Sequence, residues 1–366
     1  YMVHAVFGQV PEMKEGRAGL HGNTIPFIHE RGVAVLGGDA ANDVIAPGRK
    51  RDFVQGDTIV IDTTTGSLGG MRHGTWVMGC IAANLQGAYV GSGFGAQFAL
   101  ARTEIDASET PVEMLYWGMG AEWADSLGAD LVTSSLGYFT FDNTADNYTY
   151  ADMDGHTTDV SRAAEIAASK GILVVNAVGN EGGNAWHYLI APSDVRSDSL
   201  IAVGAVDQNG MVASFSSYGP SADGRTKPDL AARGVADTLV SATGDPNSYI
   251  STSGTSFATP LVAGLAACLL QARPAWSPTL VSRALRETAS RAGDPDDRVG
   301  WGIPDGLAAL RWDPGPAGVP PPSPRFGLRL LGPNPLRVGG APLWLQFGLG
   351  SANQGSTAAR VRVFDA

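Results

Sequence analysis

Short apolar runs that alternate with helical stretches constrain the fold of this chain more than any other feature of its sequence. Ile172 to Val175 is an apolar run of strand length, followed by a turn that contains glycine. Glu113 to Leu127 and the alanine-rich Ser161 to Lys170 have helical spacing, and the short strand Ala129 to Val132 lies between them. The alternation predicts an α/β fold, a doubly wound parallel sheet with helices on both faces. Ligands of such sheets bind at the carboxyl ends of the strands.

A serine stands just before a long apolar run, in the segment Gly254 to Pro260. The run Leu261 to Gln271 predicts a buried helix, which places Ser256 near the start of that helix. A hydroxyl at such a position lies beside free backbone N–H groups and the positive end of the helix dipole. A helix-capping role would explain this serine alone, so its meaning depends on partners elsewhere in the chain.

A histidine and an asparagine at two other element ends supply such partners. His73 precedes the predicted helix Trp76 to Ala83, and Asn180 ends the turn after the strand that begins at Ile172. An imidazole can take the proton of a serine hydroxyl, and a side-chain amide can donate to an oxyanion. We therefore predict acyl transfer, with Ser256 as nucleophile, His73 as general base and then acid, and Asn180 as oxyanion donor.

The order of these motifs resembles that of the subtilisin-like serine proteases. His73-Gly74-Thr75, Gly179-Asn180 and Gly254-Thr255-Ser256 follow one another as in that family, and Lys227-Pro228-Asp229 is similar to the family's segment ahead of the serine. The resemblance covers residues 30 to 310. It implies a serine endopeptidase (a hydrolase) that acts on polypeptides without a required cofactor, secreted or held at a bacterial cell surface. It also implies signal and pro-segments that precede the segment beginning at Tyr1.

A substrate-binding edge is a further implication of the resemblance. Ser135, Leu136 and Gly137 look like the family's substrate-binding strand, and Gly179 lies beside Asn180 in the turn that would face it. Such an edge would hold a peptide backbone by strand addition. Small residues along this edge leave space, so we expect a medium or large apolar side chain before the cleaved bond.

The acid that orients the histidine has two candidates. The family carries this aspartate at the end of its first core strand. Asp39 follows the strand Val33 to Leu36 after two glycines and precedes His73 by 34 residues (73 − 39). Asp62 directly follows an apolar run, but it precedes His73 by only 11 residues (73 − 62). We expect Asp39 to be the triad acid, with Asp62 as its competitor.

A third alignment leaves the histidine without an acid. If the first core strand is Met2 to Val10, then Phe7 or Gly8 occupies the acid position. This alignment defines the alternative function, a catalytically impaired surface or matrix protein that keeps the protease fold for binding.

Charge and hydropathy exclude several other functions. The formal net charge is −11 and the isoelectric point is near 4.9, whereas a nucleic-acid partner requires a basic surface. The sequence has no apolar run long enough to predict a transmembrane segment.

The chain has two cysteines, Cys80 and Cys268, and both lie in apolar helical runs. We expect two buried small hydrophobic residues. If the two helices pack side by side, as the family resemblance implies, a disulfide between them is the alternative.

An acidic loop is the one candidate for a bound cation. Hard carboxylate ligands around a glycine turn would suit a structural Ca²⁺. The spacing is not that of an EF-hand, so we expect a solvated loop with no metal. Five aspartates form this loop: Asp142, Asp146, Asp152, Asp154 and Asp159.

The C-terminal part of the chain differs in composition from the rest. Residues 313–325 are rich in proline and glycine, which predicts a semi-rigid linker after a peptidase domain at 1–312. Beyond it, residues 326–331, 343–347 and 359–364 alternate like half-buried strands. We interpret 326–366 as a partial β-sandwich that resembles an Ig-like C-terminal sorting module of secreted bacterial proteins.

Overall fold

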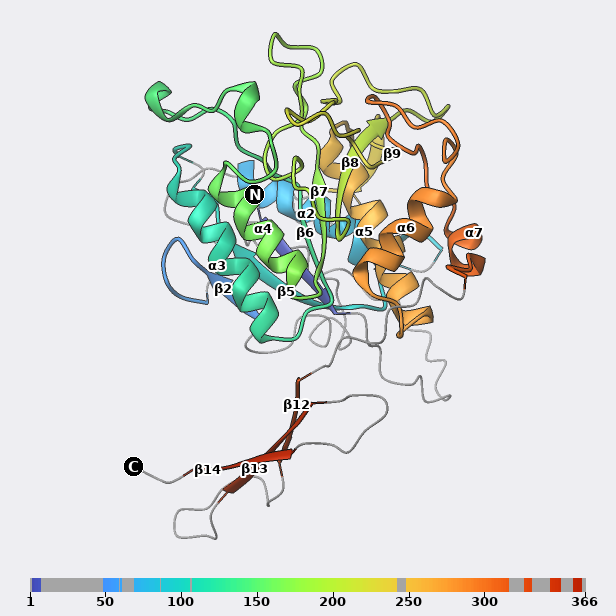
Figure 1. Ribbon diagram of the computed structural model, residues 1–366. Helices are drawn as coiled ribbons and strands as arrows, with labels where there is room; N and C mark the ends of the chain where they lie inside the picture. Colours follow the sequence, from blue (N-terminus) through green and yellow to red (C-terminus); the bar gives the residue numbers. More distant parts are fainter. Residues whose placement is uncertain are drawn as a thin grey trace. The chain divides into compact units, whose positions relative to one another are not determined.

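The computed structural model describes residues 2–7, 49–58, 60, 69–85, 87–105, 107–241, 248–315, 326–330, 343–349 and 358–363. The chain forms two compact units. The first comprises Tyr1–Pro274 with Pro278–Asp313, and the second comprises Pro314–Ala366 with Ala275–Ser277. Figure 1 shows their helices and strands.

A seven-stranded sheet forms the centre of the first unit, with the strand order β2-β5-β1-β6-β7-β8-β9. The strands are β1 (Met2–Phe7), β2 (Lys50–Asp52), β5 (Gln97–Arg102), β6 (Leu131–Ser134), β7 (Leu173–Ala177), β8 (Leu200–Val206) and β9 (Leu230–Arg233). The pairs β2/β5, β6/β7, β7/β8 and β8/β9 are parallel, as predicted. β1 departs from the prediction because it runs antiparallel to both β5 and β6.

Helices surround this sheet, and two short strand pairs lie outside it (Figure 1). The helices are α2 (Gly69–Ala82), α3 (Val112–Ser126), α4 (Asp159–Ser169), α5 (Thr255–Ala272), α6 (Pro278–Glu287) and α7 (Gly306–Arg311). The strand pairs are β3 (Asn84–Leu85) with β4 (Tyr89–Val90), and β10 (Asp237–Val240) with β11 (Tyr249–Thr252). Two 3₁₀ turns, η1 (Thr144–Asp146) and η2 (Tyr150–Asp152), follow β6.

Two consecutive serines show that helices cover both faces of the sheet. Trp117 of α3 donates its Nε1–H to Ser134 Oγ at 3.2 Å, whereas Ser135 Oγ donates to the Ser256 carbonyl of α5 at 2.8 Å. Neighbouring residues of an extended chain point to opposite faces. Since α4 packs beside α3 and α2 packs beside α5, each face carries a helix pair. This arrangement agrees with the predicted doubly wound fold.

α5 is the central helix of the unit and packs against β6, β7, β8 and β9. Among the described residues it is the one helix that is long and apolar enough to cross a membrane by length and composition alone. However, 67% of it is buried inside the protein, as expected for the core helix of an α/β unit.

Both helices that carry predicted site residues begin earlier than the sequence indicates. α2 starts at Gly69, so His73 lies inside the helix and not before it. α5 starts at Thr255, so Ser256 belongs to its first turn. Glycine and proline at these starts disfavour a helix locally, but packing of α2 on α5 stabilises the extra turns.

The described strands of the second unit form a three-stranded antiparallel sheet. β13 (Leu343–Leu349) lies between β12 (Phe326–Leu330) and β14 (Ala358–Val363). Phe326 is paired with Leu349, and Leu343 with Val363.

Candidate active site

Ser256 lies in the first turn of α5, at the wall of a pocket of about 210 Å³. Its side chain is 7% exposed. The N–H groups of a first helical turn have no carbonyl of a preceding turn to bond, so they remain available to an acceptor in the pocket. The nucleophile candidate therefore lies beside backbone donors.

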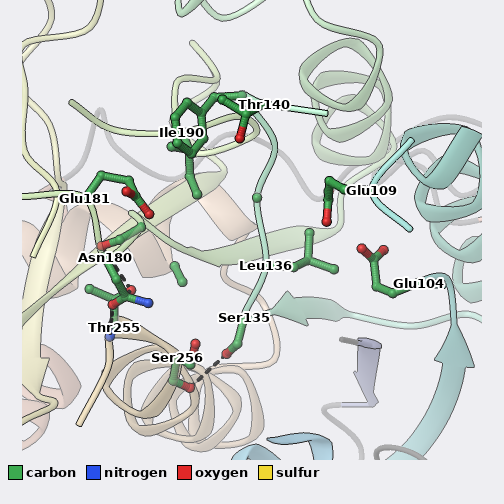
Figure 2. Close-up of a pocket in the computed structure, with 14 residues that line it drawn as sticks. Glu104, Glu109, Ser135, Leu136, Thr140, Asn180, Glu181, Ile190, Thr255 and Ser256 are labelled. Carbon is green, nitrogen blue, oxygen red and sulfur yellow. Dashed lines mark hydrogen bonds between the residues drawn. The ribbon is translucent and has the colours of Figure 1, made fainter. Parts of the chain in front are cut away.

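A proline in α5 leaves a carbonyl at this serine without its helical donor. Pro260 has no N–H, and the carbonyl it would have bonded in an α-helix is that of Ser256. Ser135 Oγ, which is buried, donates to this carbonyl at 2.8 Å. The bond joins the end of β6 to the start of α5 and fixes the predicted substrate edge next to the serine (Figure 2).

Asn180 is held in place by Thr255, the residue before Ser256. Its Oδ1 accepts hydrogen bonds from Thr255 N at 2.9 Å and from Thr255 Oγ1 at 3.0 Å. Thr255 Oγ1 also lies 3.2 Å from the Gly179 carbonyl. Because two donors from α5 fix the amide oxygen, the amide nitrogen is directed away from them. Figure 2 shows Asn180 and Ser256 at the same end of the pocket.

His73 reaches the start of α5 through an aromatic contact. Its ring centroid is 5.9 Å from that of Phe257, the residue that follows Ser256. Trp76, one helical turn further along α2, contacts the same phenylalanine at 6.3 Å. Val77 and Cys80 complete a helical face that packs on Phe257. The packing of α2 on α5 thus brings His73 next to the serine-bearing turn.

The candidate acids lie outside the described residues. This holds for Asp39 and Asp62, and also for Gly8 of the third alignment. The second residue of that alignment, Phe7, ends the antiparallel strand β1.

The pocket gathers six predicted residues from three segments of the chain. Ser135, Leu136 and Gly137 follow β6, Gly179 and Asn180 follow β7, and Ser256 starts α5. These segments meet at the carboxyl ends of parallel strands, as the sheet topology predicts.

Asn176 anchors the substrate edge from the neighbouring strand β7, although nothing in its local sequence singles it out. Its Nδ2 donates to the Leu136 carbonyl at 3.0 Å and to the Ala177 carbonyl at 2.8 Å. Its Oδ1 accepts from Ser134 Oγ, and the residue is fully buried. An unpaired side-chain amide at this depth would be unfavourable. The hydrogen bonds of Asn176 therefore hold the backbone in place where β6 leaves the sheet.

Three carboxylates on the pocket wall were not predicted: Glu104, Glu109 and Glu181. Glu104 accepts hydrogen bonds from Tyr138 Oη at 2.6 Å and from Thr103 Oγ1 at 2.8 Å. Burial, together with the neighbouring Glu113 carboxylate, raises the pKa of Glu109 to about 8. Figure 2 shows the Glu104 and Glu109 side chains near Leu136, on the far side of the 135–140 segment from Asn180. Their position after β5, at the carboxyl end of a strand, is the signal that could have identified them.

Ile190 is a further unpredicted pocket residue, and it packs against two of the small residues that are expected to leave space. Its Cγ1 would lie 2.6 Å from a Cβ added at Gly137 and 3.0 Å from one added at Gly179. Ile190 therefore contacts both glycines, although it lies more than fifty positions after Gly137 in the sequence. Their small size accommodates Ile190.

The acidic loop uses its carboxylates for local contacts. Asp154 accepts from the backbone of His156 and Thr157 at 3.0 and 2.9 Å, and Asp152 accepts from Thr149 N at 2.7 Å. Within the described part of the chain, no three acidic, histidine or cysteine side chains are grouped as metal ligands would be.

The two cysteines are free thiols, although their helices do pack together. Cys80 is buried, and burial raises the pKa of its thiol to about 12. Cys268 is exposed, which corrects the prediction that both are buried. It lies on α5 at a position that faces away from the sheet, and its thiol contacts the Ser92 carbonyl.

Lys227 and Asp229, in the segment Lys227-Pro228-Asp229, form a buried ion pair. Lys227 Nζ lies 2.7 Å from Asp229 Oδ2, and each side chain is 4% exposed. Asp229 Oδ2 also accepts from Ala202 N of β8 at 2.8 Å. The segment therefore ties β9 to β8 and has a structural role.

Comparison with known proteins agrees with this architecture. Residues 27–302 match the model of the subtilase family, Peptidase_S8. Subtilisin BL of Lederbergia lenta is 32% identical over 242 residues, which cover 66% of this chain and 78% of that protein. M-protease of Shouchella clausii is also 32% identical over 242 residues, but the match spans only 56% of its length.

Solved structures show the same fold. The structure of the Prenylagaramide maturation protease PagA is 26% identical, with a TM-score of 0.51 over 66% of this chain and 81% of that one. The family match covers the described helices α2 to α6, together with the segments that supply Ser256, Asn180 and His73. The chain therefore belongs to the subtilase family of serine peptidases.

Proposed function

We propose that this chain is a secreted serine endopeptidase that cleaves polypeptides with Ser256, His73 and Asn180. The observation that carries the proposal is the pocket in which Ser256 and Asn180 lie beside the Ser135-to-Gly137 edge. A hydroxyl, an amide donor and an extended edge are the groups that acyl transfer from a bound peptide requires.

The proposed reaction starts with the peptide backbone held along residues 135–137. Ser256 Oγ attacks the carbonyl carbon while its proton passes to the His73 imidazole. The negative oxygen of the tetrahedral intermediate accepts from Asn180 Nδ2 and from the Ser256 N–H. His73 then protonates the leaving amine, and water releases the acyl group by the same steps in reverse order. The chemistry needs no cofactor.

We propose Asp39 as the acid that orients His73, with Asp62 as its competitor. A carboxylate partner fixes the imidazole tautomer and stabilises the imidazolium that forms. In serine proteases, replacing this acid by its amide lowers kcat by about 10⁴-fold. Comparing Asp39→Asn with Asp62→Asn identifies the acid, since only the correct amide substitution should show a loss of this order.

The alternative of an impaired protease requires that neither Asp39 nor Asp62 orients the His73 ring. The described pocket offers no feature that favours it. Hydrolysis of an unstructured protein such as casein by the wild type, with Ser256→Ala as control, tests the proposed activity. Wild-type hydrolysis that Ser256→Ala abolishes supports the enzyme; equal rates for the two proteins would refute it.

We also propose that the second unit is the start of an Ig-like module that serves in sorting or surface attachment. Its three antiparallel strands and the proline-rich segment before them support this assignment. The acidic net charge of −11 is compatible with secretion.

A further inference from the structure

We infer that Ile190 closes the subsite for the residue before the cleaved bond, so that this peptidase accepts only small side chains there: glycine, alanine or serine. The inference rests on the proposed function, because it concerns the peptide that Ser256 would cleave. It reverses the expectation of a medium or large apolar side chain.

The position of this subsite follows from the catalytic groups. A reacting carbonyl must lie about 3 Å from Ser256 Oγ, with its oxygen toward Asn180. The side chain of the same residue is one carbon away. With the peptide backbone along residues 135–137, that side chain enters the space between Gly137 and Gly179, which both line the pocket.

Ile190 occupies that space. Its Cγ1 and Cδ1 would be 2.6 and 2.7 Å from a Cβ at Gly137, and 3.0 and 3.1 Å from a Cβ at Gly179. One side chain thus contacts both glycine backbones that flank the subsite. It is 8% exposed, which fits a residue that ends the pocket and does not project into solvent. Figure 2 shows Ile190 at the end of the pocket opposite Ser256.

The backbone holds Ile190 rigidly in this place. Its N–H donates to the Val178 carbonyl at 3.2 Å, and the next carbonyl, of Ala191, accepts from Tyr138 N at 2.8 Å. These bonds tie the segment to both walls of the subsite. A β-branched side chain has restricted χ1 freedom, which limits how far Ile190 can move aside. Close-packed interiors also resist added volume, because a larger side chain forces its neighbours to shift.

Peptides that differ only in the residue before the cleaved bond test the inference. For the wild type we expect kcat/KM to be at least about tenfold higher with alanine than with leucine or phenylalanine. Ile190→Gly should reverse the order and raise phenylalanine cleavage by about tenfold or more, whereas Ile190→Val, which keeps the subsite filled, should retain the alanine preference. Wild-type cleavage of phenylalanine as fast as alanine would overturn the inference.

A binding experiment separates this inference from the proposed function. Peptides that end in a free carboxylate at alanine or phenylalanine are the acyl-side products, and calorimetry measures their binding without any reaction. We expect the alanine product to bind the wild type more tightly, and the phenylalanine product to gain affinity in Ile190→Gly. If this pattern appears while no peptide is hydrolysed, the proposed activity fails and the subsite assignment stands. Equal binding of both products to both proteins would contradict the assignment, and circular dichroism confirms that each variant is folded.

Discussion

A single hydroxyl couples the predicted substrate edge to the helix that carries the proposed nucleophile. Ser135 satisfies the Ser256 carbonyl that Pro260 cannot bond. We expect Ser135→Ala to lower the free energy of unfolding by about 1–3 kcal/mol, because it leaves a buried acceptor without a donor. Urea denaturation measures this change.

The proline offers a matched control for this hydrogen bond. Pro260→Ala restores a helical N–H for the same carbonyl, so Ser135→Ala should be less destabilising in the Pro260→Ala background than in the wild type. Equal effects in both backgrounds would show that the Ser135 bond does not replace the missing helical bond.

Asn180 is the residue at which the oxyanion donor can be tested separately. Removing the equivalent donor in subtilisin itself lowers kcat by about 10²–10³-fold, and we expect a loss of this order for Asn180→Ala with KM little changed. Thr255→Val is the control variant. It removes one hydrogen-bond donor to Asn180 Oδ1 but leaves the Asn180 amide in place. A change in KM alone would assign Asn180 to ground-state binding.

At the residue scale, the sequence predicts which residues line the pocket better than it predicts the shape of the pocket. Short sequence motifs contain Ser256, Asn180 and Ser135. The residues beside them in each motif also lie beside them in the folded protein. Asn176 acts on Leu136 and Ile190 acts on Gly137, each at least forty positions away, so no local pattern marks them. In the sequence, Gly137 and Gly179 suggest an open subsite. In the structure Ile190 packs on both glycines, and this contact is visible only in three dimensions.

The segment between β5 and α3 carries a pH-dependent contribution to stability. Burial raises the pKa of Glu109 to about 8 and that of Glu113 to about 7, from an ordinary value of 4.5. Between pH 4.5 and 8 the folded protein therefore binds more protons than the unfolded chain, so these groups make stability fall as the pH rises.

Glu109→Gln should reduce this decline, because the amide remains neutral throughout the range. Urea denaturation at pH 5 and pH 8 measures the effect. Glu122→Gln, which removes the same formal charge from an exposed position of α3, is the control and should leave the pH dependence unchanged. The assignment would be contradicted if the wild-type stability rose from pH 5 to pH 8 and Glu109→Gln showed the same rise.

At the scale of helices and strands, periodicity identifies the elements but not their limits. Helices α3 and α4 lie within two residues of the predicted ranges, since hydrophobic spacing and a following glycine define them. α2 and α5 start several residues before their predicted positions because they stabilise each other by packing. The antiparallel direction of β1 could not be predicted, because an apolar run carries no information about strand direction.

At the scale of the whole molecule, the fold follows from the order of strands and helices, and the site follows from the fold. Two of the three pocket segments follow the parallel strands β6 and β7, whose carboxyl ends lie at one edge of the sheet, and the third is the start of α5, which packs against both strands. The sequence could predict this meeting but not settle the identity of the acid, since it leaves three alignments of the first strand open, of which the one with Asp39 is favoured.

The most direct measurement of the central claim is the reaction of the folded protein with a serine-directed fluorophosphonate, followed by mass spectrometry of its peptides. An activated hydroxyl reacts and an ordinary one does not. We predict a single adduct on Ser256 that is lost in His73→Ala and after denaturation. Absence of an adduct on Ser256 in folded protein, or equal labelling of the folded and denatured chains, would contradict the account.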